Sequence, residues 1–154
     1  LLMVQGAPYK GWKVLEKGIE DGIVKEKLET LRLLAQAMAL AQETDAQIPV
    51  LEKAAKLAKD GEIDLYLGQA WMQKTEWGKA SEALGRAVQK GVKRPGPAYL
   101  LLGTARFNHG KFDEARSAFT RARSDDSSAQ SAEQWLRYVE AEKKRREYLA
   151  AAAE

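Results

Sequence analysis

Apolar and small residues return along the chain in a fixed order at long, regular intervals. One copy of the order begins at Leu67-Gly68 and continues with Ala80, Leu84 and Ala87. The next copy begins 35 residues later (residue 67 to residue 102) and consists of Leu102-Gly103, Ala115, Phe119 and Ala122. Within each copy, spacings of three and four residues place the side chains on one face of a helix. The pattern therefore predicts repeated pairs of helices.

Two further copies precede these, one complete and one partial. The complete copy consists of Leu34-Ala35, Gln47, Leu51 and Ala54, and it begins 33 residues before its successor (residue 34 to residue 67). The partial copy has Gly11, Leu15 and Gly18 as its second helix. Of its first helix we expect only the end, at residues 1–5. Because the chain opens at Leu1 without a methionine, we interpret it as the C-terminal fragment of a longer array.

These copies divide the chain into five expected units. They are a partial repeat at residues 1–22, repeats at 28–60, 61–95 and 96–127, and a C-terminal capping helix at 128–154. Helix-breaking runs at 60–61, 93–97 and 124–128 separate them, and Pro97 suits the first turn of its helix. The apolar side of the last helix is expected to hold Trp135, Leu136, Val139 and Leu149, and its polar side to hold the ion pairs Glu140–Lys144 and Glu142–Arg146.

The order Leu-Gly-x2-aromatic, then Ala-x3-Phe and a further small residue, on a period of about 34, resembles the tetratricopeptide repeat. Here it stands as Leu67-Gly68-Gln69-Ala70-Trp71, and the resemblance covers roughly residues 6–122. It implies an all-α, right-handed solenoid of helical hairpins with a C-terminal capping helix. Two residues depart from the pattern. Arg106 stands where the family prefers an aromatic residue, and Gln47 replaces a small one.

The resemblance also implies that the first helix of each hairpin lines a concave groove that binds a partner. Carried over position by position, the groove residues are Arg32, Gln36, Leu65, Gln69, Met72, Leu100, Thr104 and Phe107, with Tyr138 from the capping helix. Ordinary packing between repeats is the alternative role of each. The carboxylate clamp of the family is not supported, because Tyr66, Pro97 and Leu101 replace its Asn, Lys and Arg. We therefore expect a protein or peptide partner, held by amide hydrogen bonds and apolar contacts.

Composition gives no support for an enzyme. The chain has one histidine, His109, and no cysteine, so the common zinc and nucleophile constellations cannot be built. The run at residues 60–64, Asp-Gly-Glu-Ile-Asp, lacks the remaining ligands of a calcium loop. We interpret it as the end of one helix and the start of the next. We expect no catalytic residue, no metal and no cofactor.

Charge argues only weakly for nucleic acid. The net charge is +3, and the basic run at residues 143–146 lies among acidic residues. A solvated, salt-bridged helix face is the favoured interpretation. The alternative function is an anionic-surface or nucleic-acid-binding module acting through this helix, and a further alternative is a regulatory domain of a larger enzyme. No apolar stretch is long enough to span a bilayer.

Several runs have a narrower resemblance, to the C-terminal region of tetratricopeptide proteins of Gram-negative bacteria encoded beside TonB–ExbB–ExbD energy-transduction genes. These runs are residues 6–11, 14–19, 48–55, 60–62, 97–103 and 134–138. The resemblance implies a non-enzymatic protein–protein interaction scaffold that assists such an envelope complex in the periplasm. Without that context, we expect a cytoplasmic scaffold.

The helix expected at residues 9–22 lacks most of its hairpin partner. Val14, Leu15 and Ile19 would then expose apolar area, which favours self-association. We expect a homodimer through this helix.

Overall fold

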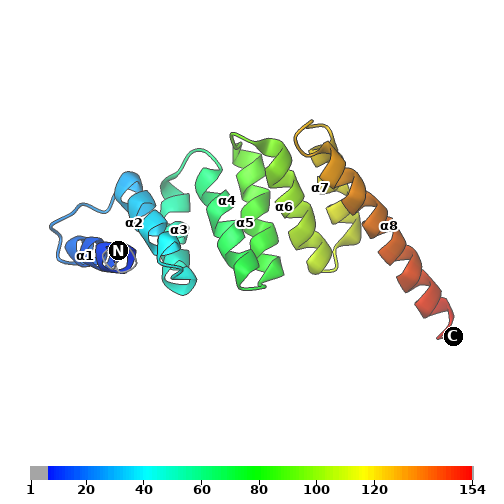
Figure 1. The fold of residues 1–154 in the computed structure, drawn as a ribbon, viewed down its shortest axis with the longest axis horizontal. Coiled ribbons are helices and arrows are strands. Elements are labelled where there is room, and N and C mark those ends of the chain that lie inside the picture. The colour runs from blue at the N-terminus through cyan, green and yellow to red at the C-terminus, as the bar shows by residue number, and fades with distance from the viewer. Residues whose placement is uncertain (1–6, 154) are drawn as a thin grey trace.

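The computed structural model describes the backbone of residues 7–153 and the side chains of residues 11–153. All regular structure in this part of the chain is helical. The helices are α1 (Ala7–Glu20), α2 (Leu28–Leu40), α3 (Thr44–Leu57), α4 (Glu62–Gln73), α5 (Trp77–Lys90), α6 (Pro95–Asn108), α7 (Phe112–Arg123) and α8 (Ala129–Ala151). They stand side by side along the long axis of the molecule, with α1 at one end and α8 at the other (Figure 1). The helix end expected at residues 1–5 lies outside the described residues.

Each turn within a hairpin contains a residue with a left-handed backbone. Gln42 (φ 59°) joins α2 to α3, Thr75 (φ 56°) joins α4 to α5, and Gly110 (φ 79°) joins α6 to α7. In the second of these turns the N–H of Thr75 donates to the carbonyl of Met72 (2.9 Å), and the next N–H donates to the carbonyl of Trp71 (3.0 Å). These bonds close the C-terminus of the first helix. The turns therefore repeat along the chain, as the apolar pattern does.

Small residues bring the two helices of a hairpin close together. A Cβ atom at Gly68 would lie 2.5 Å from Cγ of Leu84, and one at Gly103 would lie 2.5 Å from Cε1 of Phe119. Leu84 and Phe119 are fully buried. Any side chain at either glycine would have to displace them, which confirms the packing expected for the repeated Leu-Gly pairs.

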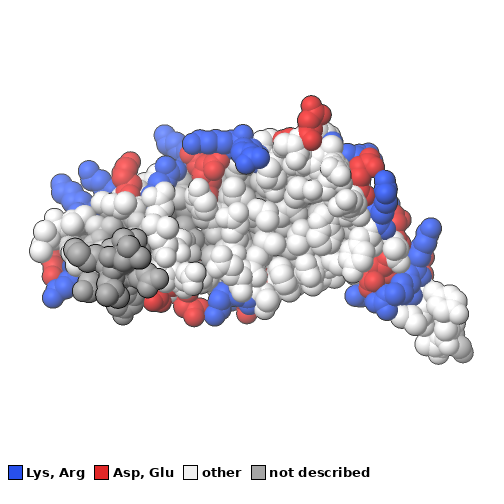
Figure 2. Space-filling view, viewed as in Figure 1, with Lys and Arg blue, Asp and Glu red and all other residues white. Residues whose placement is uncertain are grey.

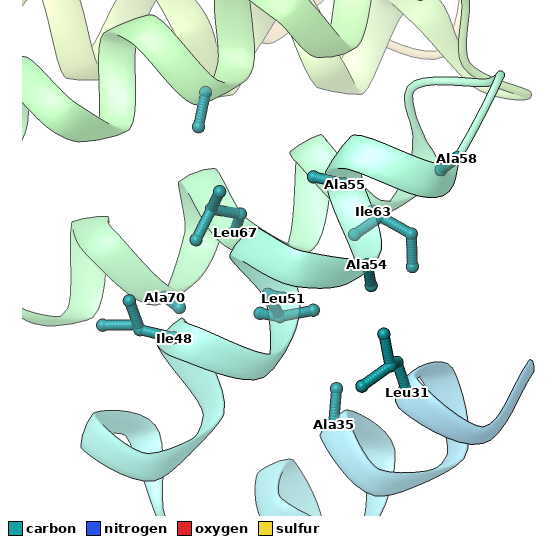
Figure 3. Close-up of a cluster of buried hydrophobic side chains, with 11 residues drawn as sticks. Leu31, Ala35, Ile48, Leu51, Ala54, Ala55, Ala58, Ile63, Leu67 and Ala70 are labelled. Atoms are coloured by element: carbon teal, nitrogen blue, oxygen red, sulfur yellow. The ribbon is translucent and has the colours of Figure 1, made fainter. Parts of the chain in front are cut away.

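The hairpins share a continuous apolar core. Leu31 of α2, Leu51 of α3 and Leu67 of α4 are each buried and belong to one cluster (Figure 3). Ala83 of α5 is a further member, so this cluster joins two successive hairpins. Stacking of this kind, in which each hairpin buries its apolar faces against its neighbours, is what a repeat solenoid requires.

The first half of α8 closes the end of the stack. Trp135 stacks on Phe119 of α7 with ring centroids 5.1 Å apart, and Val139 is fully buried. The prediction that Leu149 belongs to the same packed side was wrong, because Leu149 is 52% exposed. The guanidinium of Arg146 already lies over Phe112, the first residue of α7. The last residues of α8 therefore extend past α7, as Figure 1 shows.

One of the two ion pairs expected on α8 forms. Nε of Arg146 lies 3.0 Å from a carboxylate oxygen of Glu142, as predicted. Glu140 instead pairs with Arg116 of α7 (3.2 Å), so the prediction that it pairs with Lys144 was wrong. The carboxylate of Glu140 can reach Arg116 on the adjacent helix. The spacing of residues within α8 alone could not predict this contact.

The helix pairs α2–α3, α4–α5 and α6–α7 follow the expected units closely. The exception is Pro95, which opens α6 one residue before the expected bound at residue 96 and leaves Pro97 third in the helix. The boundaries expected between one repeat and the next stay predictions.

Candidate binding surface

The residues expected to bind a partner lie on α2, α4, α6 and α8, the first helices of the hairpins and the capping helix. We call the exposed side of these four helices the first-helix face. The nine expected groove residues fall into three groups along it. Arg32 and Gln36 line a pocket between α2 and α4. Leu65 and Met72 pack, half-buried, against the cluster that contains Leu102.

The third group lies at the α6–α8 end. Leu100 and Phe107 pack against the cluster of Phe119 and Val139, and Thr104 donates its hydroxyl hydrogen to the carbonyl of Leu100 (2.9 Å). Tyr138 is 56% exposed. Gln69 lies half-buried on α4, between the two ends. The structure thus places the nine residues in separate groups along the face, and only the members of a group lie close together. Their role in binding a partner stays a prediction.

The pocket between α2 and α4 has a volume of about 320 Å³ and mixed polarity. Nη2 of Arg32 lies 3.6 Å from a carboxylate oxygen of Asp60, beyond hydrogen-bond distance. The carboxylate of Glu62 accepts the backbone N–H of Lys93 (2.6 Å). Tyr66 is 48% exposed and lines the same pocket. Two cations and two carboxylates therefore balance around it.

Sequence reasoning missed part of this pocket. From the sequence, Tyr66 stands out only as a departure from the carboxylate clamp, and Asp60 only as part of a run that lacks the ligands of a calcium loop and is interpreted as a helix boundary. Gln47 also lines the pocket, and its side-chain amide donates to the carbonyl of Ala35 (3.1 Å). That bond gives a physical reason for an amide where the repeat prefers a small residue. The one available signal was the position of Tyr66, directly before the Leu67-Gly68 pair.

The α6–α8 end of the face is aromatic. Phe107 lies 5.6 Å from Trp135 and 5.1 Å from Tyr138, measured between ring centroids, and 5.2 Å from Phe112. Offset and edge-on arrangements at these separations are favourable beyond the burial of the rings alone. The exposed ring of Tyr138 therefore packs against Phe107 and Trp135.

The middle of the first-helix face carries almost no charge. After its first turn α4 has no charged residue, and the Asp64 of that turn is fully buried. The Asp64 carboxylate is paired with Arg86 (2.9 Å) and Lys90 (2.6 Å) of α5. The one charged residue of α6, Arg106, is directed to Glu114 of α7. Figure 2 shows charged side chains along the edges of the visible face and over α8, and few over α4 to α6.

The basic run at residues 143–146 is partly neutralised by two carboxylates, Asp113 and Glu142. Lys143 lies 2.7 Å from Asp113 of α7, and both Arg145 and Arg146 hydrogen-bond to Glu142. Hydrogen bonds from Arg145 and Arg146 lower the pKa of Glu142 from 4.5 to about 2. Three of the four basic side chains are thus already paired with carboxylates, which counts against a surface prepared for phosphate.

Other chemistry finds little support among the described residues. No cluster of three or more His, Asp or Glu side chains in this part of the chain could hold a metal ion. His109 directly follows α6 as an exposed residue of the turn. The carboxylate of Asp60 accepts the N–H of Glu62 (3.1 Å) at the start of α4, as the helix-start interpretation expected. Among the helices described, none combines the length and the apolar character needed to cross a membrane.

Several solved structures share the arrangement of helices seen in this chain. No family model matches the chain, and no curated protein matches its sequence. A crystal structure of MamA superposes with a TM-score of 0.78 at 22% identity, covering 97% of this chain and 80% of that one. MamA from Desulfovibrio magneticus RS-1, residues 41 to the end, gives 0.74 at 19% identity, covering 97% and 83%.

The fold is of the tetratricopeptide type. A chain in a T3SS complex from Aeromonas hydrophila shares it with a TM-score of 0.65 at 16% identity, covering 82% of this chain and 89% of that one. The all-α stack of sequential hairpins expected from the repeated Leu-Gly pairs is therefore confirmed. At these identities the similarity concerns the fold alone.

Proposed function

We propose that this chain is a non-enzymatic protein–protein interaction module that binds a partner segment along its first-helix face. The observation that carries the proposal is the near absence of charged side chains from the middle of that face, on α4 and α6. α4 and α6 present apolar and uncharged polar groups, whereas α5 and α7 carry most of the neighbouring charged residues. A surface of this kind suits an extended or helical segment rich in apolar and amide side chains.

The ordered aromatic end is the expected anchor of the segment. Exposed aromatic side chains held by their neighbours lose little conformational entropy on binding, and Tyr is enriched among residues that dominate interface energies. Tyr138 meets both conditions, since its ring packs on Phe107 while 56% of the residue stays exposed.

A peptide-display selection on the purified chain tests this proposal. We expect enriched peptides to be poor in charge and to bind a Tyr138→Ala variant about tenfold or more weakly, the loss of an aromatic anchor. Tyr148→Ala is the matched control, because Tyr148 is 75% exposed on the same helix but lies beyond α7. Equal weakening by both substitutions, or by neither, would contradict the site.

The cellular setting proposed is narrower and rests on the sequence resemblance alone. It is a periplasmic role beside a TonB-type energy-transduction complex. The genes next to the one encoding this chain, and fractionation of the tagged full-length protein from its own host, test the setting. A cytoplasmic location, or neighbouring genes without energy-transduction components, would reject it and leave the binding module untouched.

Self-association is a second proposed interaction, at the α1 end of the molecule. Val14 is 73% exposed and Ile23 is 81% exposed, and both line an apolar groove between α1 and α2. Leu15 and Ile19, expected to share this exposure, instead pack half-buried against the cluster of Trp12 and Met38. That part of the expectation was wrong, because α2 covers them.

A further inference from the structure

The pocket between α2 and α4 holds hydrogen-bonding groups that the protein itself leaves unused. Nε of Arg32 is shielded from solvent and has no hydrogen-bond partner among the described residues. Its Nη2 lies 3.6 Å from Oδ1 of Asp60, which is too far for a hydrogen bond. The side chain keeps 40% exposure, and neither Nη nitrogen is shielded in this way. The guanidinium is therefore a donor that a ligand in the pocket can use.

Asp60 offers the matching acceptor. Its Oδ1 accepts the backbone N–H of Glu62 (3.1 Å), and within the described part of the chain nothing donates to its Oδ2. Its side chain is 55% exposed. Arg32 lies on α2 and Asp60 in the loop before α4, so an unused donor and an unused acceptor face each other between two first helices.

The pocket as a whole is electrically balanced. Glu62 and Lys93 also line it, and the carboxylate of Glu62 accepts the backbone N–H of Lys93 (2.6 Å). A carboxylate entering the pocket would meet Asp60 and Glu62 as well as the two cations. An ammonium group would meet Arg32 and Lys93 as well as the two carboxylates. Because juxtaposed like charges disfavour binding, the pocket selects against both kinds of charged group.

The size and the floor of the pocket suit a whole side chain. Its volume is about 320 Å³, whereas a single water occupies about 30 Å³ in the liquid. Buried Ala35, Leu51 and Ile63 contribute apolar lining (Figure 3). A ligand group with an apolar stem and a polar, uncharged end therefore fills this pocket better than a single bridging water does.

We propose that this pocket binds the primary amide of a glutamine or asparagine side chain of the partner. The amide oxygen accepts from the guanidinium of Arg32, and the amide NH2 donates to the carboxylate of Asp60. A primary amide combines an acceptor and two donors in one uncharged group, so it uses both residues without adding a charge. The inference rests on the proposed function, because it names the side chain that the first-helix face recognises at its α2–α4 end.

Peptides enriched by display selection on the wild-type chain are the probes. We expect them to carry a glutamine or asparagine whose replacement by leucine, or by the matching acid, weakens binding about tenfold or more. Fluorescence anisotropy of labelled peptides measures the affinities, and exchanging glutamine and asparagine at that position shows which length the pocket prefers. Enriched peptides without such an amide would overturn the proposal.

Arg32→Met tests which residue meets the amide. We expect this variant to bind the amide peptide about tenfold more weakly and its leucine version with nearly unchanged affinity, because only the amide peptide loses a hydrogen bond. Equal weakening of the two peptides would overturn the pairing with Arg32.

Asp60→Asn tests the acceptor through a change of specificity. The side-chain oxygen of asparagine still accepts the N–H of Glu62, so the start of α4 is kept, but the pocket gains a net positive charge. We expect this variant to bind the acid version of the peptide at least as tightly as the amide version, which reverses the wild-type order. Loss of folding could not produce such a reversal. An unchanged preference for the amide would overturn the proposal.

Asp126→Asn is the matched control. Asp126 is exposed in the loop between α7 and α8, and its replacement changes the net charge of the chain by the same amount. It should keep the wild-type order of the two peptides. Reversal in this variant too would show that net charge, rather than the pocket, sets the preference.

The amide pocket and the proposed function can fail separately. Weaker binding by Tyr138→Ala, with no effect of Arg32→Met or Asp60→Asn, would overturn the amide pocket alone. Unchanged binding by all three variants would overturn the binding face as well.

Discussion

Thr75 is a β-branched residue in a conformation that suits glycine. Its φ of 56° is matched by 79° at Gly110, the equivalent turn residue of the next hairpin. A side chain in this region costs about 1–2 kcal/mol, whereas the added flexibility of glycine in the unfolded chain costs roughly 0.5–1 kcal/mol. We expect Thr75→Gly to raise the free energy of unfolding by about 0.5–1 kcal/mol, measured by urea denaturation. Gly110→Ala should lower it, and an increase there would contradict this explanation.

Asp64 is a fully buried carboxylate that depends on two cations of α5. Arg86 and Lys90 reach it from the solvent side, and their side chains keep 48% and 29% exposure. The ammonium of Lys90 also donates to the carbonyl of Ala55 in α3 (2.8 Å), so it joins two hairpins.

Removing both cations should therefore lower the free energy of unfolding by more than the loss of two partly exposed ion pairs would. The Arg86→Met/Lys90→Met double variant leaves a buried charge without a partner, and we expect a loss of about 3–5 kcal/mol. Adding Asp64→Leu should restore most of this loss, because the buried charge is then gone. Thermal unfolding of the three proteins compares them, and a triple variant no more stable than the double would refute the role of the carboxylate.

At the scale of the hairpin, two glycines with similar sequence surroundings should behave in opposite ways. A Cβ atom at Gly103 would overlap Phe119, whereas one at Gly85 of α5 would meet nothing within 4 Å. We expect Gly103→Ala to destabilise the chain by about 1–3 kcal/mol through overpacking. We expect Gly85→Ala to stabilise it by about 0.5–1 kcal/mol, because alanine favours the helix. Chemical denaturation measures both, and the same sign for both would argue against the close approach.

The second half of α8 should respond to acid. The pKa of Glu142 is lowered to about 2, so its ionised form is favoured in the folded helix. The stabilisation is fully present above the ordinary pKa of 4.5 and is lost as the pH falls towards 2. We expect the carboxyl carbon of Glu142 to titrate near pH 2 by NMR, and hydrogen exchange at the end of α8 to rise over the same interval. A midpoint near 4.5 would show that the bonds from Arg145 and Arg146 do not persist in solution.

Local spacing allowed the hairpins and the capping helix to be predicted. Within each copy, the small residues mark where two helices approach closely, and the large apolar residues mark what fills the space between them. The Gly68 and Gly103 contacts are examples. Contacts between elements were not predictable in the same way. Three such features depend on where a neighbouring helix begins or ends. They are the pairing of Glu140 with Arg116 instead of Lys144, the burial of Asp64 and the exposure of Leu149. The pocket beside Tyr66 was missed for the same reason, since it combines residues of three helices and two loops.

In the middle of the molecule, charge is sorted by helix. The second helices α5 and α7 carry it there, and the first helices α4 and α6 are almost free of it. A partner bound on the first-helix face should therefore be held with little dependence on ionic strength. We expect the affinity for display-selected peptides to change less than about threefold between roughly 50 mM and 200 mM salt, whereas a protein with 6–10 phosphate contacts would lose about 10³–10⁵. A steep loss would favour the basic end of α8 as the binding site.

The near absence of ionic groups in the middle of the first-helix face also limits the reagents that can detect a partner there. Neither α4 nor α6 contains a lysine, so amine-reactive cross-linkers would couple a bound protein only through the rims, at residues such as Lys74 and Lys93. Maps built on lysine chemistry would then report the periphery of a contact as its centre. A photoreactive amino acid incorporated at Gln69 inserts into ordinary C–H bonds and would capture whatever lies above the middle of the stack, and one at Tyr138 would capture whatever lies above its α8 end.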